Sequence, residues 1–451
     1  QPLDRDLSAY ATIGDRMRLG ALPYRDLFDH KQPLVYVVNF ALALIAPRSV
    51  PAIRVAAGVA GALTGALLYL FLVPLGRGRA AAAAALAILL GSSRWVEGVD
   101  LNTEHLMAPF ACAAVLLPVA RRAKADRLGP FASGLLAGGA ILAKAVGALA
   151  IPAALLPILA SRRGTAPPAR ARLLLFAAGA GLPAATVALF YASQGALSDL
   201  VYANVVHNAR YLRMAPPLAF WKALDFGPVV GPLLFVALAA GAFRLARRSG
   251  DSLLTWAALL WLLGAALGAK LGRWEYPHYL APLVAPIALL LCLPLSPPGG
   301  RSAPAPAAIR ALVAAGFSIV VLADSLRAWR RTPGELAALL YGEQALIWSE
   351  EEEVSSWLRS RSASDDTLFV AHQEPGFYWL SGLAPATRYL YDPVFDPEFA
   401  TTVVRELAAR PPRFVVVPFP PVPPYLAVLA SGLYSEPVRF GPIRVFERVP
   451  R

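Results

Sequence analysis

The sequence predicts a mostly α fold: a polytopic membrane protein of about ten spanning helices, followed by a C-terminal extracytoplasmic α/β domain. Of the 451 residues, 57% are hydrophobic and 16% are charged, whereas soluble domains contain about 45–50% apolar residues. The mean hydropathy is +0.53. Apolar stretches rich in Ala and Leu recur from about residue 34 to residue 323 and then stop, which indicates a membrane-embedded region followed by a soluble tail.

The predicted spans are apolar runs that are long enough, or nearly long enough, to cross about 30 Å of hydrocarbon. Several are short, so either their boundaries differ or these helices are buried among their neighbours in a thinned or cavity-lined region. The run 34–46 is shorter still and predicts a helix lying at the membrane interface. The predicted spans are 52–75, 79–92, 105–120, 130–143, 146–160, 172–192, 228–243, 252–269, 279–295 and 306–323.

The loops between these runs predict the orientation. Lys and Arg are twice as numerous in one set of loops, 76–79, 121–129, 161–172, 244–251 and 296–305, as in the opposite set. Because cytoplasmic loops carry the excess of Lys and Arg, the first set is expected in the cytoplasm. The outward face then receives the loops opposite, 93–104, 144–145, 193–227 and 270–278, together with the N-terminal 33 residues and everything after 324.

The chain is therefore expected to comprise a first extracytoplasmic loop (1–33), a transmembrane helical domain (34–324) and an extracytoplasmic domain (325–451). No apolar segment precedes the acidic cluster at Asp4 and Asp6, so we expect a further spanning helix or signal-anchor before Gln1. Heavy use of Ala, Arg and Pro is typical of a GC-rich bacterial genome, and hence of the bacterial cytoplasmic membrane.

The net charge of +13 does not indicate nucleic-acid binding. Basic residues lie at the ends of apolar segments, and no basic helix alternates with an aromatic platform. The two cysteines, Cys112 and Cys292, both lie inside apolar stretches, which argues against a disulfide framework or a thiolate metal site.

The tail has a different pattern. A helix is predicted near 335–361, strands at 367–371 and 414–419, and a closing strand pattern over 438–449, with prolines between 418 and 424. The tail lacks a nucleotide-binding glycine loop. We expect it either to cover or shape a site on the outer membrane face or to act as a structural cap.

Ionisable residues are concentrated in the predicted outward loops. Residues 1–33 contain five acids and five bases, a composition typical of a solvated loop or of a site held against the membrane. Lys144 stands in a run of about 30 residues nearly free of charge. Such a lysine is costly in a bilayer unless it reaches the interface or meets an anion.

Several short motifs, taken in order, resemble the polyprenyl-phosphate-sugar-dependent glycosyltransferases of superfamily C. The most similar members are the family 39 protein mannosyltransferase-like enzymes and the lipid A aminoarabinose transferase. The resemblance covers most of residues 4–295 and the outward tail. Its motifs are the acids Asp4 and Asp6 followed by Tyr10-Ala11-x-Ile13, Gly20, Pro23-Tyr24, Lys31-x-Pro33-Leu34-x-Tyr36, Asn102-Thr103-Glu104, Gly138 to Lys144, and Arg273 to Tyr279.

The resemblance implies transfer of a sugar from a polyprenyl monophosphate to a hydroxyl of a lipid, glycan or protein, with inversion. Such a reaction requires a base for the acceptor proton and cations for the departing phosphate. Asp6, four residues before Tyr10, matches the family's catalytic aspartate, and Asp4 competes for this role because Arg5 separates the two acids. Glu104 matches the family's second acidic position, where it could orient the acceptor or Asp6.

The same resemblance assigns the phosphate-binding cations. Lys31 and Lys144 match the family's lysines, and Arg273 and His278 share the last outward loop. Three more residues are expected to contact the acceptor or to support the acids. Asp100 lies within reach of Glu104 if the helix begins at Asp100. The other two residues are Tyr10 and Tyr279.

One difference from the family bears on whether the substrate is the same. Where the aminoarabinose transferase has an arginine before the first-loop tyrosine, this chain has Ala9, so Arg5, Arg16 or Arg273 would have to replace it. No cofactor is predicted; a divalent metal ion at Asp4 and Asp6 would need help from phosphate or water, and none is predicted. Two other functions stay open: a polytopic transporter or lipid flippase, and a non-catalytic envelope-assembly protein.

Overall fold

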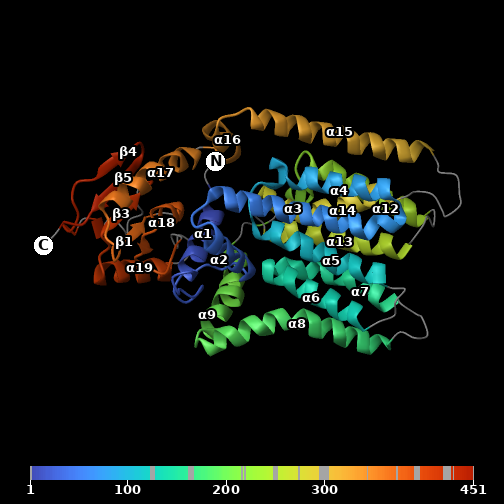
Figure 1. Ribbon diagram of the computed structural model, residues 1–451, viewed down its shortest axis with the longest axis horizontal. Helices are drawn as coiled ribbons and strands as arrows, with labels where there is room; N and C mark the ends of the chain where they lie inside the picture. The colour runs from blue at the N-terminus through green and yellow to red at the C-terminus, as the bar shows by residue number, and fades with distance from the viewer. Residues whose placement is uncertain are drawn as a thin grey trace. The chain divides into compact units, whose positions relative to one another are not determined.

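The computed structural model divides the chain into two compact parts (Figure 1). We call Arg54–Leu197 with Tyr211–Ala328 the helical part, and Gln1–Ile53 with Ser198–Arg210 and Trp329–Arg451 the mixed part. Each part is described by itself. The described residues are 3–121, 127–160, 167–214, 217, 220–246, 252–272, 275–293, 304–342, 344–371, 374–390, 397–419, 428–429 and 431–449.

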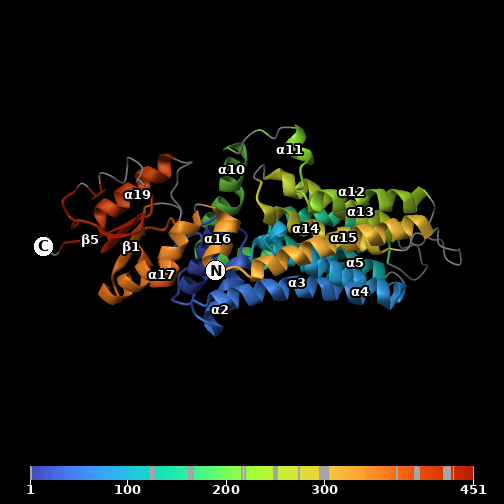
Figure 2. The same ribbon diagram turned by 90° about the horizontal axis from the view of Figure 1, so that it is seen from above.

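The helical part is built from helices that run side by side (Figures 1 and 2). Every predicted span falls on one of them, which confirms the mostly helical architecture. In chain order they are α3 (Val50–Leu72), α4 (Arg77–Gly91), α5 (Thr103–Arg121), α6 (Leu128–Ala143), α7 (Ile151–Ala160), α8 (Ala169–Ser193), α12 (Val230–Ala246), α13 (Ser252–Leu271), α14 (Ala281–Cys292) and α15 (Pro304–Trp329).

Helix length separates two groups within this part. Four helices are long and apolar enough to cross a membrane by length and composition: Val50–Leu75, Thr103–Arg121, Ala169–Ser193 and Ser252–Leu271. Shorter apolar helices include Leu128–Ala143, Ala145–Ala160, Val230–Ala246 and Pro277–Cys292. The protein therefore has the character of a membrane protein, and the number of ten crossings stays a prediction.

The centre of the helical part is formed by α5 and α14. From Ala281 to Leu291, every residue of α14 is buried, and most of α5 is buried as well. A helix that is apolar on all sides is stable only when other helices or lipid surround it. Prolines inside both helices, including Pro109 and Pro286, are tolerated there because neighbouring groups satisfy the freed carbonyls.

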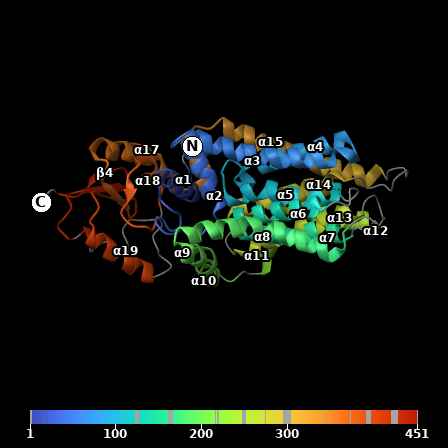
Figure 3. The same ribbon diagram turned by 60° about the horizontal axis from the view of Figure 1, so that its bottom comes forward.

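Helices α6 and α8 lie against each other through glycines (Figure 3). A Cβ at Gly134 would lie 2.1 Å from the carbonyl oxygen of Phe176, and a Cβ at Gly179 would lie 2.1 Å from that of Phe131. Small residues allow helix backbones to approach closely in a bilayer, where contact replaces the hydrophobic effect as the driving force. These glycines therefore fix α8 on the bundle.

The mixed part contains one five-stranded sheet of order β2-β1-β3-β5-β4. Strand β1 is parallel to β2 and β3, and β5 is antiparallel to β3 and β4. Helices α17 and α19 lie on opposite faces of this sheet (Figure 2), so the four residues of β3 are all buried. The elements are β1 (Thr367–Val370), β2 (Ala384–Pro385), β3 (Phe414–Val417), β4 (Val438–Phe440), β5 (Ile443–Glu447), α16 (Pro333–Tyr341), α17 (Gln344–Arg361), α18 (Gly376–Ser381) and α19 (Pro397–Ala409).

Two predicted loops contain helices. The segment 1–33 includes α1 (Arg5–Met17), which packs on α2 (Leu34–Ile45) where Gly14 meets the backbone of Asn39. The segment 193–227 includes α9 (Leu197–Val201), a π-helix (Tyr202–His207), α10 (Asn208–Met214) and α11 (Phe220–Leu224). These helices are polar or short, so a search for long apolar runs does not detect them.

Candidate functional site

The two acids of the first motif have different roles in the mixed part. Asp4 is the N-cap of α1, and its carboxylate accepts a hydrogen bond of 2.7 Å from the backbone N–H of Leu7. An N-cap aspartate satisfies an amide that has no partner within the helix. Asp6, in the first turn, is not used as a cap and is 31% exposed.

Asp6 has two side-chain partners. The ammonium of Lys31 lies 2.9 Å from its Oδ2, and the hydroxyl of Tyr10, one turn further along α1, donates to the same oxygen over 3.2 Å. The structure thus brings Asp6, Tyr10 and Lys31 together. A carboxylate held by a cation and a phenol is fixed in position while its exposed side stays accessible.

Tyrosines hold the Lys31 segment in place. The hydroxyl of Tyr24 donates to the carbonyl of Lys31 over 2.8 Å, and the rings of Tyr24 and Tyr36 pack edge to face with centroids 5.6 Å apart. Tyr10 packs similarly on Tyr36, at 6.3 Å. Edge-to-face pairs of this kind favour one arrangement of the rings, so the position of the lysine is defined by the fold.

A further acid in this segment, Asp29, is missing from the sequence-based set. It is 1% exposed, and its Oδ1 accepts from the backbone N–H of His30 over 2.6 Å. Burial raises the pKa of Asp29 to about 6; Lys31 opposes this shift and Asp6 adds to it. The Asp-His-Lys run at 29–31 was a usable signal, because an acid two residues from the motif lysine must share its surroundings.

Helix α1 is also held by residues near the end of the chain. Arg5 forms a 2.9 Å ion pair with the buried carboxylate of Glu374. Thr12 donates to the carbonyl of Pro375 over 3.3 Å, and Arg16 donates to that of Gly382 over 2.6 Å. Glu374 thereby becomes part of the surroundings of the Asp6 helix.

A second polar cluster lies in the helical part, at the start of α5. Glu104 is in the first turn of α5 and is 1% exposed. Lys144 lies in extended backbone between α6 and the 3₁₀ helix Ala145–Ala150, and its ammonium forms an ion pair and hydrogen bond with Glu104. The same ammonium lies 4.1 Å from the ring centroid of Tyr279, which is a favourable cation–π distance.

His278 belongs to the same cluster. Its Nδ1 lies 2.5 Å from Oε2 of Glu97, and its Nε2 lies 3.9 Å from Oε1 of Glu104. Its ring stacks on Tyr276 and meets Tyr279 edge to face. Glu97 is a second residue that the sequence-based set missed, because no periodic pattern marks a turn residue.

The condition on which Asp100 would share a helix face with Glu104 is not met. Helix α5 begins at Thr103, so Asp100 lies before the helix and not one turn along its face. Its side chain is fully buried and forms an ion pair with Arg54, which also donates to the carbonyl of Val99 over 3.0 Å. This pair fixes the turn that leads into Glu104.

Asn102 and His105 flank Glu104 and are also buried, at 1% and 5% exposure. Among the described residues, the side-chain nitrogen and oxygen of Asn102 have no hydrogen-bond partner. Buried polar atoms of this kind are usually satisfied by water or a bound group.

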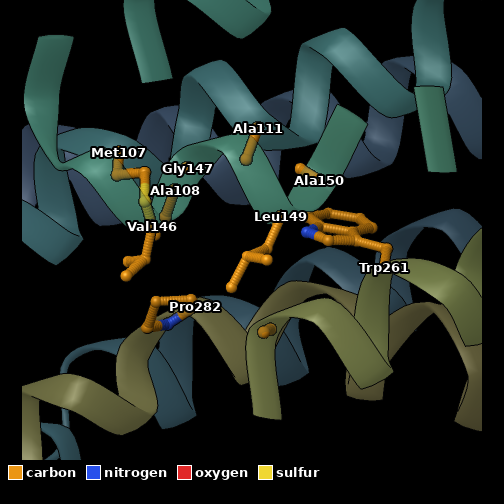
Figure 4. A pocket seen from close by; sticks show the side chains of 10 residues that line it. Met107, Ala108, Ala111, Val146, Gly147, Leu149, Ala150, Trp261 and Pro282 are labelled. Carbon is orange, nitrogen blue, oxygen red and sulfur yellow. The ribbon is translucent and has the colours of Figure 1, made fainter. Parts of the chain in front are cut away.

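A small pocket beside this cluster is lined by Glu104, Lys144 and Tyr279 together with small apolar residues such as Gly264 and Gly268. A neighbouring small pocket shares Met107, Val146, Ala265 and Pro282 with the first. Its lining side chains are apolar, from Met107 to Trp261 at the other end (Figure 4). The helical part thus places a pocket lined in part by charged side chains next to a pocket lined by apolar ones.

The structure places most of the predicted site residues in two groups. The mixed part holds Asp4, Asp6, Tyr10 and Lys31, and the helical part holds Glu104, Lys144, His278 and Tyr279. Arg273 lies outside the described residues. Within either part taken alone, the described residues include no group of three acids, histidines or cysteines close enough to share a metal ion.

Comparisons with known proteins agree with this architecture. A family model of dolichyl-phosphate-mannose-protein mannosyltransferases matches residues 30–193. The crystal structure of ArnT from Cupriavidus metallidurans bound to undecaprenyl phosphate has a TM-score of 0.62 and 14% identity, covering 100% of this chain and 94% of that one. The apo form of the same enzyme has a TM-score of 0.56 and 14% identity, and the match covers 98% of this chain and 93% of that one.

A third similar structure is the oligosaccharyltransferase of Archaeoglobus fulgidus tethered to an acceptor peptide. Its TM-score is 0.52 at 12% identity; the match covers 92% of this chain but only 65% of that longer one. No curated protein matches the sequence. At such identities the structural likeness establishes the fold, and together with the family model it confirms the predicted resemblance to the glycosyltransferases of superfamily C.

Proposed function

We propose that this protein is a multi-pass glycosyltransferase of the bacterial cytoplasmic membrane. It transfers a sugar from a polyprenyl monophosphate to a hydroxyl of a lipid, glycan or protein on the outer face, with inversion at the sugar carbon. The mixed part, including the C-terminal domain, lies on that outer face. The likeness to ArnT and to an oligosaccharyltransferase supports this class of reaction.

The observation that carries the proposal is the position of Lys144. Lys144 lines a pocket whose neighbour is lined by apolar side chains. An amphiphile with an anionic head and a long hydrocarbon tail matches both features, since a lysine among apolar helices gains from an anion and apolar side chains favour contact with hydrocarbon. A polyprenyl phosphate is such a molecule.

In the proposed reaction, the acceptor oxygen attacks the sugar carbon while the bond from that carbon to the phosphate oxygen breaks. Asp6 receives the acceptor proton, and the lipid phosphate leaves with the electron pair. Asp4 is the weaker candidate for this base because its carboxylate caps α1. One base and a stabilised leaving group are sufficient for such a direct displacement.

The cations have the complementary role of stabilising charge on the departing phosphate. We assign this role to Lys144 and His278 in the helical part, to Arg273, and to Lys31 beside Asp6. Glu104 orients Lys144 through their ion pair. Tyr10 supports Asp6, Tyr279 supports Lys144, and Asp100 holds the turn before Glu104.

The test is transfer of radiolabelled sugar from a panel of polyprenyl-phosphate sugars, in membranes that carry the full-length protein. Asp6→Asn is measured beside the wild type, with Asp365→Asn as the matched control because Asp365 is an exposed acid of the same part. We expect transfer by the wild type and the control, and a loss of at least 100-fold in Asp6→Asn.

Transfer by Asp6→Asn at the wild-type rate would keep the enzyme but move the base to Asp4 or Glu104, which Asp4→Asn and Glu104→Gln then distinguish. No transfer from any donor with a full set of lipid, glycan and peptide acceptors would contradict the proposal. It would favour a lipid flippase or transporter if polyprenyl phosphate still binds, and an assembly protein if it does not.

A further inference from the structure

Glu97 adopts a backbone conformation that a glutamate rarely takes. Its φ of 50° and ψ of 44° lie in the left-handed region, directly after the 3₁₀ turn Arg94–Val96. A Cβ in this region is crowded by the neighbouring carbonyl, so glycine is the residue that usually occupies it. Strain of this kind persists where the surrounding structure demands it, and often where a side chain has a task.

The neighbouring backbone explains why the turn cannot easily move. A Cβ at Gly98 would lie only 2.0 Å from the carbonyl oxygen of Gly91, so this segment is packed against the end of α4. A glycine at position 97 would satisfy the same geometry without strain. The presence of glutamate there therefore calls for an explanation in its side chain.

The side chain of Glu97 contacts one ring nitrogen of His278. Its Oε2 lies 2.5 Å from Nδ1, and the exposed fractions of the two side chains are 16% and 8%. A carboxylate bound to one nitrogen of a histidine keeps a proton on that nitrogen and sets the orientation of the ring. The stacked ring of Tyr276, 5.5 Å away and 8° from parallel, restricts the ring further.

This orientation directs the other nitrogen toward Glu104, whose side chain lines the pocket. The Nε2 of His278 lies 3.9 Å from Oε1 of Glu104, which is too long for a hydrogen bond. The same oxygen of Glu104 is bound to Lys144. The nitrogen therefore faces the ion pair of Glu104 and Lys144, and the rings of His278 and Tyr279 meet edge to face.

We propose that Glu97 is a positioning residue: it holds His278 with Nε2 toward the phosphate of a polyprenyl-phosphate lipid, and the left-handed turn is retained for that purpose. The inference rests on the proposed function, in which Lys144 and His278 bind the phosphate. It predicts that the left-handed backbone at residue 97 lowers the stability of the protein, whereas the Glu97 carboxylate strengthens binding of the lipid phosphate.

The experiment compares Glu97→Gly, Glu97→Gln and Val99→Ala in the purified full-length protein. Val99 is an exposed neighbour in the same loop and serves as the control. The readouts are the dissociation constant for undecaprenyl phosphate and the thermal midpoint. We expect Glu97→Gly to bind at least tenfold more weakly with an equal or higher midpoint, Glu97→Gln to bind more weakly than the wild type, and Val99→Ala to match it.

A second comparison tests whether Glu97 acts through His278. In a His278→Asn background, Glu97→Gly should cause no further loss of binding, because the ring it orients is absent. The inference is overturned if Glu97→Gly binds within twofold of the wild type, if its midpoint falls together with its affinity, or if its loss is unchanged in the His278→Asn background.

Binding and transfer separate this inference from the proposed function. If the wild type binds undecaprenyl phosphate but transfers no sugar, the proposed reaction fails while the comparison of Glu97 variants still decides the inference. If the wild type does not bind the lipid, the role of His278 at a phosphate is wrong and the inference is overturned.

Discussion

Nη2 of Arg5 lies 2.9 Å from Oε1 of Glu374, although 369 residues separate the two in the chain. Arg5 directly precedes Asp6, the proposed base, and Glu374 is 1% exposed. A residue far along the chain in the mixed part thus holds the first turn of the helix that carries the proposed base. This region of the chain has a direct structural connection to the proposed chemistry and is not only a cover.

This ion pair leads to the first prediction. Glu374→Gln leaves the Arg5 side chain, which is 25% exposed, beside an uncharged partner, and breaking a partly buried pair costs about 1–3 kcal/mol. We expect a lower free energy of unfolding and a several-fold fall in sugar transfer. Arg361→Gln is the control because its pair with Glu447 is largely exposed and should contribute less than about 1 kcal/mol. Equal effects of the two variants would contradict the prediction.

A second prediction concerns the pair of Lys144 and Glu104. Replacing Lys144 by Met leaves the buried carboxylate of Glu104 without this cation, and breaking such a partly buried pair costs about 1–3 kcal/mol. The double variant Lys144→Met/Glu104→Gln should recover much of that stability but not transfer, because the cation for the phosphate is still missing. Chemical denaturation and transfer assays on the wild type, Lys144→Met, Glu104→Gln and the double variant form a double-mutant cycle. Restored transfer in the double variant would rule out Lys144 as a phosphate ligand.

The third prediction is a pH dependence of stability. The pKa of Asp29 is raised by burial to about 6, so the folded state holds this proton more tightly than the unfolded chain. The stabilisation is complete below about pH 4 and is lost as the pH rises through about 6. The thermal midpoint of Asp29→Asn should therefore fall less than that of the wild type between pH 4 and 6.

Asp26 provides the control for this measurement. Its pKa is lowered, chiefly by the hydrogen bond from Arg25, so its stabilisation is present above its unfolded pKa and is lost only as the pH falls below that value. Asp26→Asn should therefore leave the slope between pH 4 and 6 unchanged. A flattened slope in Asp26→Asn, or an unchanged slope in Asp29→Asn, would show that other groups set the dependence.

The fourth prediction tests the glycine contact between α6 and α8. A methyl group at Gly134 would lie 2.1 Å from a backbone oxygen, so the helices must separate. We expect Gly134→Ala to destabilise the protein by about 1–3 kcal/mol. Gly61→Ala in α3 is the matched control, because nothing lies within 4 Å of its Cβ and alanine should there gain up to about 1 kcal/mol. Thermal unfolding in detergent measures both.

The sequence predicts the helical part well for a physical reason. A backbone in hydrocarbon must satisfy its own hydrogen bonds, so each apolar run of sufficient length becomes a helix. Helix α1 follows no such rule: its sequence is mixed, and it is stabilised by the Asp4 cap and by contacts with α2 and α18. Its contacts with residues 374–382 could not be inferred from sequence spacing.

The residues of the candidate site could be predicted from the sequence where they belong to a short motif. Asp6, Tyr10 and Lys31 are near in sequence and meet in the structure, and Glu104 and Lys144 meet because α5 and α6 are neighbours. Glu97 was not predictable, since its role depends on a left-handed turn and on a histidine 181 residues away. Whether Asp100 shares a helix face with Glu104 depended on where the helix begins, and α5 begins at Thr103.

The strand order of the mixed part bears on how the protein is made. Strand β5, Ile443–Glu447, lies between β3 and β4, so the sheet is incomplete until the ribosome has translated every membrane helix. The segment that binds Arg5, Thr12 and Arg16 belongs to the same late domain. While the membrane helices are being inserted, α1, which carries Asp6, therefore lacks its contacts with residues 374–382. Premature stop codons before residue 443 should yield inserted but inactive polypeptides, which quality-control proteases can recognise by their open sheet edge.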